Sequence, residues 1–327
     1  MALDDTLVGR AAKALLGASR VAICAHQDPD GDAVGSSLGM RAVLDAMGVE
    51  SLVLSAGDEM PATYAFLEGF DEVRPASSVR DEAFDVFVAL DTTDVERLGD
   101  GAGVASQADI LVNLDHHPDN AGFGDVAIVD PSAAAVGLMI WEMLTALGVT
   151  PGPRIATPLY VALMTDTGRF GHSNTDARAL LAATQMVRAG ADPAGLADAV
   201  YRSRSHAAMA LAGRVLSRIQ HLNGGKVALS WLDSSDMEEL GATSADTEDL
   251  VDWVRMEAGP QIAILAKVSG GRTRLSMRSR DDFDVGETAR RLGGGGHRVA
   301  AGATVDGGLD DALRQVLPLL PGWGDDD

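Results

Sequence analysis

The stretch VAICAHQDPDGDAVGSSLGMRAVLDAMG, residues 21–48, places an apolar run, a turn and a helical pattern in direct succession. Residues 21–26 have the length and the apolar character of a buried strand. Residues 33–47 repeat apolar side chains at helical spacing, and Gly48 ends the pattern as glycine commonly ends a helix. A strand that leads directly into a helix is the repeating unit of parallel sheets. This stretch therefore predicts the first unit of an α/β fold.

The same alternation of strand and helix continues through the first half of the chain. It predicts a mostly parallel, doubly wound sheet that helices cover on both faces. Further strands are expected at residues 51–55, 85–91, 110–114 and 126–129, and helices at residues 62–67, 133–147, 154–165 and 175–189.

The pattern changes beyond about residue 200. We expect one helix from residue 193 across Ser205 to residue 221, and then a second, smaller α/β C-terminal domain. In that domain strands are expected at residues 226–231, 261–268 and 272–280, and a helix at residues 284–292. The predicted organisation is a first domain over residues 1–200, a linker over residues 201–207 and a second domain over residues 208–327.

The composition is that of a globular protein with a strong acidic excess. Of the 327 residues 46% are hydrophobic, and the formal net charge is −22. Binding to a long nucleic acid by charge alone needs clustered lysines and arginines, so this balance argues against a long duplex as partner. A local basic pocket for a short anionic substrate is compatible with the same balance.

The cysteine content and the length of the apolar segments indicate where in the cell the protein is expected. Cys24 is the single cysteine, which excludes an intramolecular disulfide and a cysteine-based zinc cluster. No segment approaches the roughly 20 apolar residues of a membrane span. The N-terminal sequence begins acidic and lacks a basic region followed by an apolar one. We therefore expect a cytoplasmic protein without a membrane partner.

Carboxylates and histidines follow the apolar elements of the first domain. Because the carboxyl ends of parallel strands meet at one edge of a sheet, these groups are expected to lie close together. They are His26, Asp28, Asp30 and Asp32 after the first strand, Asp91 after the third, Asp115, His116 and His117 after the fourth, and Asp166 at the end of a helix.

A cluster of this kind needs a cation, since uncompensated carboxylates repel each other or shift their pKa values upward. Oxygen ligands with some imidazole and no thiolate suit Mn²⁺ or Mg²⁺, with Zn²⁺ and Fe²⁺ as alternatives. The candidate ligands outnumber what one catalytic ion uses. They favour a two-metal site, in which a bridging water becomes the nucleophile and the metals steady a phosphoryl group.

Two other interpretations of DPDGD, residues 28–32, compete with a metal site. Aspartate, proline and glycine are also typical of a solvated turn. The segment further suggests the nucleophilic loop of haloacid-dehalogenase-type phosphatases, which need Thr or Val after the glycine and a downstream lysine. Here Asp32 follows the glycine, and Lys226 and Lys267 lie outside the first domain. Four clusters at the ends of apolar elements favour the metal site over both.

Six segments together resemble the DHH phosphoesterases, a family named for Asp-His-His. In the first domain they are HQDPDGDAVGS at 26–36, ALDTTDVERLG at 89–99, NLDHH at 113–117 and TDTGRF at 165–170. In the second domain, LSMRSR at 275–280 and RLGGGGHRVAAGA at 291–303 resemble the DHH-associated C-terminal domain. Size and organisation are similar to the branch of nanoRNases and pAp phosphatases, which includes linear and cyclic dinucleotide phosphodiesterases.

The resemblance implies a role for each matching residue. One Mn²⁺ would be held by His26, Asp30 and Asp91, and the other by Asp32, Asp91, His116 and Asp166, with Asp91 bridging. Asp115 would orient an imidazole, and His117 would face the substrate phosphate or the leaving group. Asp28 is expected in a turn or a cap. The substrate's other phosphate would be bound by Arg278, Ser279, His297, Arg298 and the amides of Gly294, Gly295 and Gly296.

The resemblance also implies a hydrolase that acts on short nucleotides. The substrates would be pAp, pApA, cyclic di-AMP and oligoribonucleotides of about two to five residues, which suit an acidic protein better than long polymers do. A homodimer is implied as well. The alternative is a non-catalytic protein that senses a nucleotide with the same site. The family pattern has Thr or Ser and often Glu where this chain has Val136, Gly137 and Leu138, which affects the expected substrate preference and packing but not the metal ligands.

Overall fold

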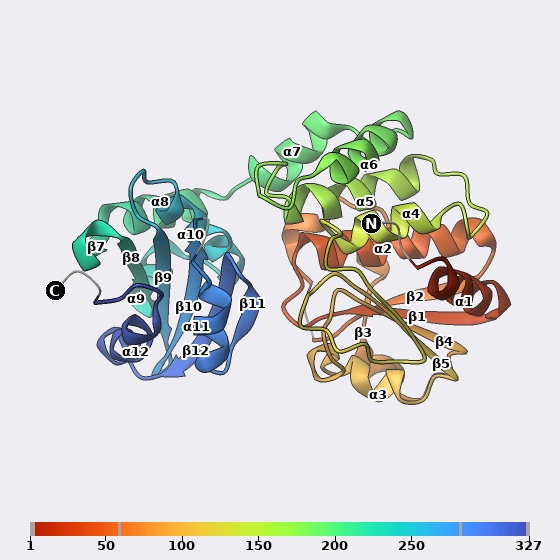
Figure 1. Cartoon of the computed structure of the whole chain (residues 1–327), viewed down its shortest axis with the longest axis horizontal. Helices are drawn as coiled ribbons and strands as arrows, with labels where there is room; N and C mark the ends of the chain where they lie inside the picture. Colours follow the sequence, from red (N-terminus) through yellow and green to blue (C-terminus); the bar gives the residue numbers. More distant parts are fainter. Residues whose placement is uncertain (1–3, 58–59, 281–282, 325–327) are drawn as a thin grey trace. The chain divides into compact units, whose positions relative to one another are not determined.

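The computed structural model describes residues 4–57, 60–280 and 283–324. Contacts divide the chain into two compact units, Met1–Arg202 and Ser203–Asp327, and each unit is built around its own six-stranded sheet (Figure 1). The parallel α/β sheet expected in the first domain and the second α/β domain are both confirmed. In the part of the chain that is described, no helix is long and apolar enough to cross a membrane.

The sheet of the first unit is parallel throughout, with strand order β3-β2-β1-β4-β5-β6. Its order reverses between β1 and β4, and in open parallel sheets ligands bind beyond the carboxyl ends of the strands at such a point. The strands are β1 Arg20–Ala25, β2 Glu50–Ser55, β3 Arg74–Pro75, β4 Val86–Leu90, β5 Ile110–Asp115 and β6 Val126–Val129.

Helices cover both faces of this sheet, because successive strand residues point to opposite sides. Val21 and Ile23 pack into a large core with α2, α4 and α5, whereas Ala22 and Cys24 pack into a smaller core with α3. Figure 1 shows these helices on the two sides of the sheet. The helices are α1 Asp5–Gly17, α2 Gly31–Met47, α3 Gly101–Ala105, α4 Val136–Met143, α5 Pro153–Asp166, α6 Ala177–Arg188 and α7 Pro193–Tyr201.

Glycines on α2 let this helix approach α5 closely. A Cβ atom at Gly35 would lie 2.5 Å from the carbonyl oxygen of Pro158, and one at Gly31 would lie 2.4 Å from Oγ1 of Thr165. Such distances exclude any side chain, so the contact depends on glycine at these positions. The close contact places the N-terminal end of α2 beside the C-terminal end of α5, where Asp166 lies.

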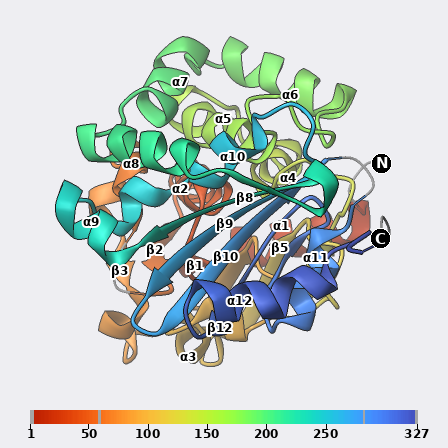
Figure 2. The ribbon, with the colours of Figure 1, turned by 90° about the vertical axis from the view of Figure 1, so that its left-hand side faces the viewer.

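The second unit has a mixed sheet with strand order β11-β12-β10-β9-β8-β7. Only the β8 and β9 pair is parallel among the pairs described. One face packs against α8 and α10 and the other against α11 and α12 (Figure 2). The elements are α8 His206–Ser217, β7 Gln220–Leu222, β8 Val227–Asp233, α9 Ser234–Leu240, α10 Leu250–Arg255, β9 Ile262–Ser269, β10 Arg272–Ser279, α11 Val285–Arg291, β11 Gly295–His297, β12 Ala300–Asp306 and α12 Leu309–Val316.

Three predicted helices differ from the structure. The single helix expected across Ser205 is wrong: α7 ends at Tyr201, and the Ser205 hydroxyl accepts a hydrogen bond from the amide of Ala208 as the N-cap of α8. The helix expected at 133–147 spans Val136–Met143, because residue 135 is extended. The helix expected at 62–67 is a single 3₁₀ turn. The antiparallel pair β11 and β12 was not predicted, since its strands are rich in glycine and alanine.

Candidate metal centre

Three neighbouring strands deliver their terminal side chains to one point. β1 leads into His26, β4 into Asp91 and β5 into His116. Among the described residues of the first unit, three groups could each hold a metal ion. Every residue of a group offers one imidazole nitrogen or carboxylate oxygen, and these atoms lie within 4.8 Å of one another. The groups are His26, Asp30 and Asp91; Asp32, Asp91 and His116; and Asp91, Asp115 and His117.

Asp91 is common to all three groups and lies at the centre of the cluster. His26 Nε2 is 3.4 Å from its Oδ2, and His116 Nε2 is 3.5 Å from its Oδ1. Asp91 has φ +56°, a left-handed conformation that costs a residue with a side chain on the order of 1 kcal/mol. Its buried Oδ1 accepts no hydrogen bond from the described residues. A buried carboxylate oxygen without a donor fits a metal ligand.

The N-terminal end of α2 positions two further carboxylates. Asp30 is the N-cap, and its Oδ1 accepts hydrogen bonds from the amides of Asp32 and Ala33. Asp32 is buried, with Oδ2 2.6 Å from the amide of Val136 and Oδ1 3.0 Å from that of Gly137. The capping residue is thus Asp30, whereas the preceding aspartate at 28 has φ +52° within the turn.

Asp166 and His116 complete this side of the cluster. Asp166 Oδ2 lies 3.8 Å from His116 Nε2, which is 4.0 Å from Asp32 Oδ2. His116 Nδ1 is 3.1 Å from the carbonyl oxygen of Ala133. Because a carbonyl only accepts, Nδ1 carries a proton, and Nε2 is the nitrogen that faces the carboxylates and could bind a cation.

Asp115 organises the second histidine of the DHH motif. Its Oδ1 accepts from His117 Nδ1 at 2.8 Å and from the amide of His116 at 2.8 Å. Its Oδ2 accepts from Nδ2 of Asn120 at 2.7 Å, and this amide also lies 2.9 Å from Oδ1 of Asn113. Asp115 is therefore fully engaged in holding the motif. Asn120 was not among the expected site residues, although an asparagine in the turn after the DHH strand is a visible signal.

Burial and neighbouring charges shift the pKa values of the carboxylates in this cluster away from their usual ranges, upward for Asp32 and Asp166 and downward for Asp91. Burial, and then the charge of Asp91, raise the pKa of Asp32 to about 7. Burial also raises the pKa of Asp166 well above its usual range. Although burial opposes ionisation, the imidazoles of His116 and His26 hold the pKa of Asp91 well below its usual range. Carboxylates that resist ionisation together are stabilised by divalent cations.

The Val136-Gly137-Leu138 segment serves the cluster without polar side chains. Val136 and Gly137 act through their backbone amides on Asp32, and Leu138 is buried in the core. A Cβ at Gly137 would lie 2.5 Å from the Cβ of Ala162 on α5, so glycine is needed there for packing. The departure from the family pattern therefore leaves the polar contacts of the cluster in place.

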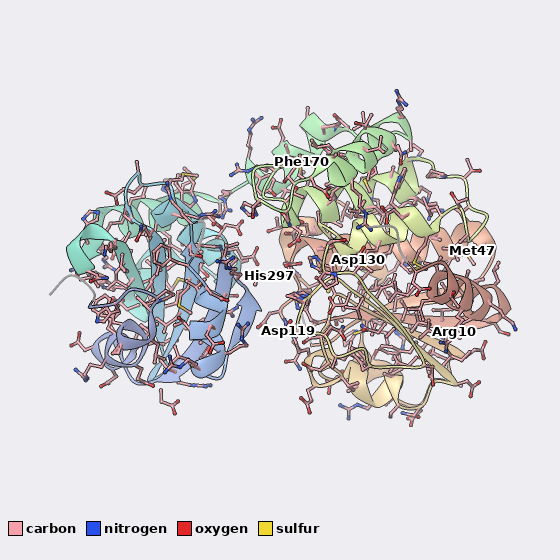
Figure 3. All side chains as sticks on the ribbon, viewed as in Figure 1. Arg10, Met47, Asp119, Asp130, Phe170 and His297 are labelled. Carbon is pink, nitrogen blue, oxygen red and sulfur yellow. The ribbon has the colours of Figure 1, made fainter. Side chains whose placement is uncertain are left out.

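The residues expected to bind a second phosphate lie in the second unit. Arg278 and Ser279 end β10; Arg278 Nε is 3.2 Å from Oδ1 of Asp252, and the buried Ser279 hydroxyl donates to the carbonyl of Phe283 at 2.6 Å. His297 ends β11 (Figure 3), directly before Arg298. The side chains of Arg278 and Ser279 are thus held within the unit, and Gly295 and Gly296 form β11 together with His297.

Packing accounts for two of the four glycines at 293–296. A Cβ at Gly294 would lie 2.1 Å from the carbonyl of Gly302, and one at Gly296, which has φ +126°, would lie 2.6 Å from that of Ala300. The Gly294 amide donates to the carbonyl of Ala289 at 2.8 Å. That amide is therefore engaged inside the unit in this conformation, while Gly295 pairs with Gly302 across the hairpin.

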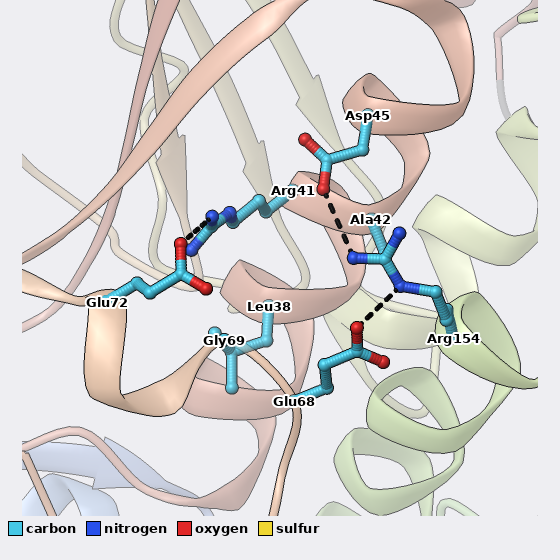
Figure 4. A pocket seen from close by; sticks show the side chains of 8 residues that line it. All are labelled: Leu38, Arg41, Ala42, Asp45, Glu68, Gly69, Glu72 and Arg154. Atoms are coloured by element: carbon cyan, nitrogen blue, oxygen red, sulfur yellow. Dashed lines mark hydrogen bonds and ion pairs between the residues drawn. The ribbon is translucent and has the colours of Figure 1, made fainter.

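A small surface pocket beside α2 does not have the character of a reaction site (Figure 4). Its arginines are already paired: Arg154 lies 2.9 Å from Glu68 and 3.5 Å from Asp45, and Arg41 pairs with Glu72. Each carboxylate there has a cationic partner, in contrast to the carboxylates around Asp91. The candidate centre is therefore the cluster at the strand ends.

Comparison with known proteins places these observations in a family. The DHH family N-terminal domain matches residues 20–163, and the DHHA1 domain matches residues 224–320. The chain is 34% identical over 317 residues to the bifunctional oligoribonuclease and PAP phosphatase NrnA of Thermus thermophilus, covering 96% of this chain and 92% of that protein. The protein of the same name from Bacillus subtilis is 26% identical, covering 90% and 91%.

A solved structure shares the whole fold. The exopolyphosphatase-related protein from Bacteroides fragilis superposes with a TM-score of 0.89 at 21% identity, covering 97% of this chain and 96% of that one. At this identity, the likeness shows that the two proteins share a fold.

Proposed function

This chain belongs to the DHH family, and from that membership we propose that it is a metal-dependent phosphoesterase that hydrolyses short nucleotides. The substrates we propose are short oligoribonucleotides, pAp, pApA and cyclic di-AMP. The observation that carries this proposal is the convergence of three strand ends on Asp91, which contributes to each of the three ligand groups. Curated relatives that align over nearly their whole length are oligoribonucleases and PAP phosphatases by name.

We propose that the centre holds two divalent cations, Mn²⁺ in preference to Mg²⁺. His26, Asp30 and Asp91 would hold one ion, and Asp32, Asp91, His116 and Asp166 the other. The orphaned Oδ1 of Asp91 and the His116 Nε2 that faces the carboxylates support this ligand set. Two bound cations supply a nucleophilic water at neutral pH and stabilise charge on the phosphoryl group.

The protein's own groups orient the reaction. Asp115 accepts a hydrogen bond from His117 Nδ1 and so fixes the orientation of the imidazole ring. The other ring nitrogen, Nε2, then faces away from Asp115. We propose that this nitrogen contacts the phosphate or gives a proton to the leaving oxygen. Asn120 donates a hydrogen bond to the other carboxylate oxygen of Asp115 and so helps to keep the His117 ring in this orientation.

We propose that residues 1–200 form the catalytic domain and residues 208–327 the substrate-binding domain, joined by residues 201–207. In the second domain Arg278, His297 and Arg298 would bind the other phosphate of the substrate. Arginine on a sheet face supports this assignment, because its fork matches phosphate oxygens. The Ser279 hydroxyl donates to the carbonyl of Phe283 within the unit. Ser279 would therefore help to position the neighbouring Arg278 at the end of β10. We further propose action in the cytoplasm, where RNA is degraded to such fragments.

We also propose a homodimer. Leu180, Leu181 and Val187 of α6 are 50%, 60% and 41% exposed. A groove of about 530 Å³ beside them is lined by Tyr160 and by Phe170, which is labelled in Figure 3. Exposed apolar surface of this kind is typical of an interface. Light scattering of the wild-type protein and of Leu181→Glu tests it: a dimer that the variant splits supports the proposal, and a wild-type monomer contradicts it.

The activity is tested by comparing kcat/KM for pAp, pApA, longer RNA and cyclic di-AMP with Mn²⁺. Release of mononucleotide or phosphate from the short substrates, with poor use of longer RNA, is the expected result. Saturable nucleotide binding without turnover under any divalent cation would overturn the proposal in favour of a nucleotide sensor.

A further inference from the structure

The segment over residues 130–137 serves the metal centre with backbone atoms alone. The Ala133 carbonyl accepts from His116 Nδ1 at 3.1 Å, and the amides of Val136 and Gly137 donate to Asp32 at 2.6 and 3.0 Å. From residue 133 to 137 the side chains are alanine, valine and glycine, which offer no hydrogen bond of their own. The position of these backbone atoms must therefore be fixed by packing and by partners outside the segment.

Arg178 of α6 contacts the chain on both sides of this segment: Asp130 and Ser132 at its start, and Glu142 on α4 beyond its end. Its Nε donates to Oε1 of Glu142 on α4 and its Nη2 donates to Oε2, each at 2.6 Å. Its Nη1 lies 2.8 Å from Oδ2 of Asp130, which follows β6 and is labelled in Figure 3, and 3.2 Å from the hydroxyl oxygen of Ser132. The side chains of Arg178 and Asp130 are only 16% and 12% exposed, so their ion pair is largely shielded from water. The Glu142 contacts are partly buried, and Ser132 lies at the surface.

The Asp130 end of this clamp leads directly to the DHH motif. Asp130 Oδ1 accepts from the amide and the hydroxyl of Ser132 at 3.0 and 2.6 Å, and its carbonyl accepts from the Ala133 amide at 2.9 Å. The Asp130 amide donates to the carbonyl of Asp115 at 3.0 Å. A turn held at this many points transmits the position of Asp130 to the carbonyl that orients His116.

We propose that Arg178 is a positioning residue for the metal centre, holding the segment whose backbone fixes His116 and Asp32. This inference rests on the proposed function and names a residue that acts on it without touching metal or substrate. The planar guanidinium suits the task because it offers donors in several fixed directions, whereas a lysine ammonium makes a single point contact. Removing groups that orient metal ligands commonly weakens metal affinity by about 10–100-fold.

Arg178→Lys is the variant that tests this inference, with Arg20→Lys as its matched control. Arg20 also pairs with two carboxylates, lying 2.8 Å from Glu50 and 2.5 Å from Glu82, and it begins β1, at the opposite end of that strand from His26. Binding of Mn²⁺ is measured by calorimetry on the full chain, beside Tm, kcat and KM for pApA. Arg178→Lys should raise the Kd for Mn²⁺ about 10-fold or more and lower kcat with little change in KM. Arg20→Lys should lower Tm without changing that Kd.

Glu142→Gln is a second variant that keeps the Asp130 contact and should shift the Kd in the same direction by less. Equal Mn²⁺ affinity in wild type and Arg178→Lys would overturn the inference, as would an equal shift in Arg20→Lys. If Arg178→Lys does not fold, the Glu142→Gln Kd decides alone. A wild-type protein that neither binds Mn²⁺ nor hydrolyses short nucleotides would instead overturn the proposed function.

Discussion

The two units of the chain distribute charge in different ways. Residues 1–202 contain 29 Asp and Glu and 12 Lys and Arg, a formal charge of −17, whereas residues 203–327 contain 19 and 14, a charge of −5. In the first unit, buried carboxylates gather at one edge of a parallel sheet. In the second, Arg272, Arg274 and Arg278 alternate with buried residues along β10. The difference is in keeping with the proposed cation centre in the first unit and the proposed phosphate site in the second.

The units also differ in what glycine does. In the first unit, Gly31 and Gly35 let α2 and α5 pack closely together. The two helices thereby bring their carboxylates near each other, against the repulsion between like charges. In the second unit, Gly294 and Gly296 let two antiparallel strands pass close together. Close approach of backbone thus shapes the acidic cluster in one unit and a sheet edge in the other.

Among the substitutions considered, replacing Asp91 should have the largest effect on the proposed function of the first unit. Asp91→Asn removes the shared carboxylate but keeps the left-handed φ, which asparagine tolerates. Bound Mn²⁺ should be lost and kcat should fall about 1,000-fold or more, because several kcal/mol of charge stabilisation disappear. Metal analysis and kinetics measure both. The control is Asp28→Asn, at a second left-handed aspartate; normal metal content in Asp91→Asn would refute the ligand set.

Replacing Asn120 tests whether Asp115 needs the hydrogen bond that the Asn120 side chain donates. In Asn120→Ala, Asp115 Oδ2 loses its 2.7 Å donor, and the His117 ring becomes less fixed. We expect kcat to fall about 10-fold with a smaller change in KM. Gln107→Ala removes two exposed side-chain hydrogen bonds in the same unit and should change neither constant. A rise in KM alone would assign Asn120 to substrate binding instead.

Replacing Arg278 tests the anion-binding side of the comparison. Arg278→Ala should raise KM for pApA about 10-fold, as expected for one lost charged hydrogen bond, and leave bound Mn²⁺ unchanged. Arg272→Ala is the matched control on the same side of β10, where the arginine pairs with Asp306 at 3.3 Å. Loss of Mn²⁺ from Arg278→Ala, or an equal rise of KM in Arg272→Ala, would contradict the proposed division of roles.

Two glycine substitutions should change stability in opposite directions by the smallest amounts. Gly35→Ala forces a Cβ to within 2.5 Å of Pro158 and should lower the free energy of unfolding by about 1–3 kcal/mol. Gly213→Ala, in α8 where nothing lies within 4 Å, should raise it by about 0.5–1 kcal/mol. Urea denaturation measures both. A stable Gly35→Ala variant with normal Mn²⁺ affinity would show that the α2–α5 contact is not needed for the centre.

Periodicity and motif position predicted the parallel strands and the meeting of His26, Asp91 and His116 at one edge, because strand direction follows from local patterns. The helix expected across Ser205 failed for a local reason: apolar spacing continues through the break, but the Ser205 hydroxyl caps a new helix. The antiparallel β11 and β12 escaped prediction because small residues carry little strand signal.

The sequence by itself determined which residue types stand at the ends of the strands, and with them the chemistry of the proposed divalent-cation centre. Only the tertiary structure decided what holds them. The amides that bind Asp32 lie 104 and 105 residues away in the chain, and the carbonyl that orients His116 belongs to an alanine. Arg178 on α6 binds Asp130 and Glu142, which lie before and after these backbone atoms in the chain. Backbone donors and acceptors are the same at every residue, so only folding reveals which of them a side chain meets.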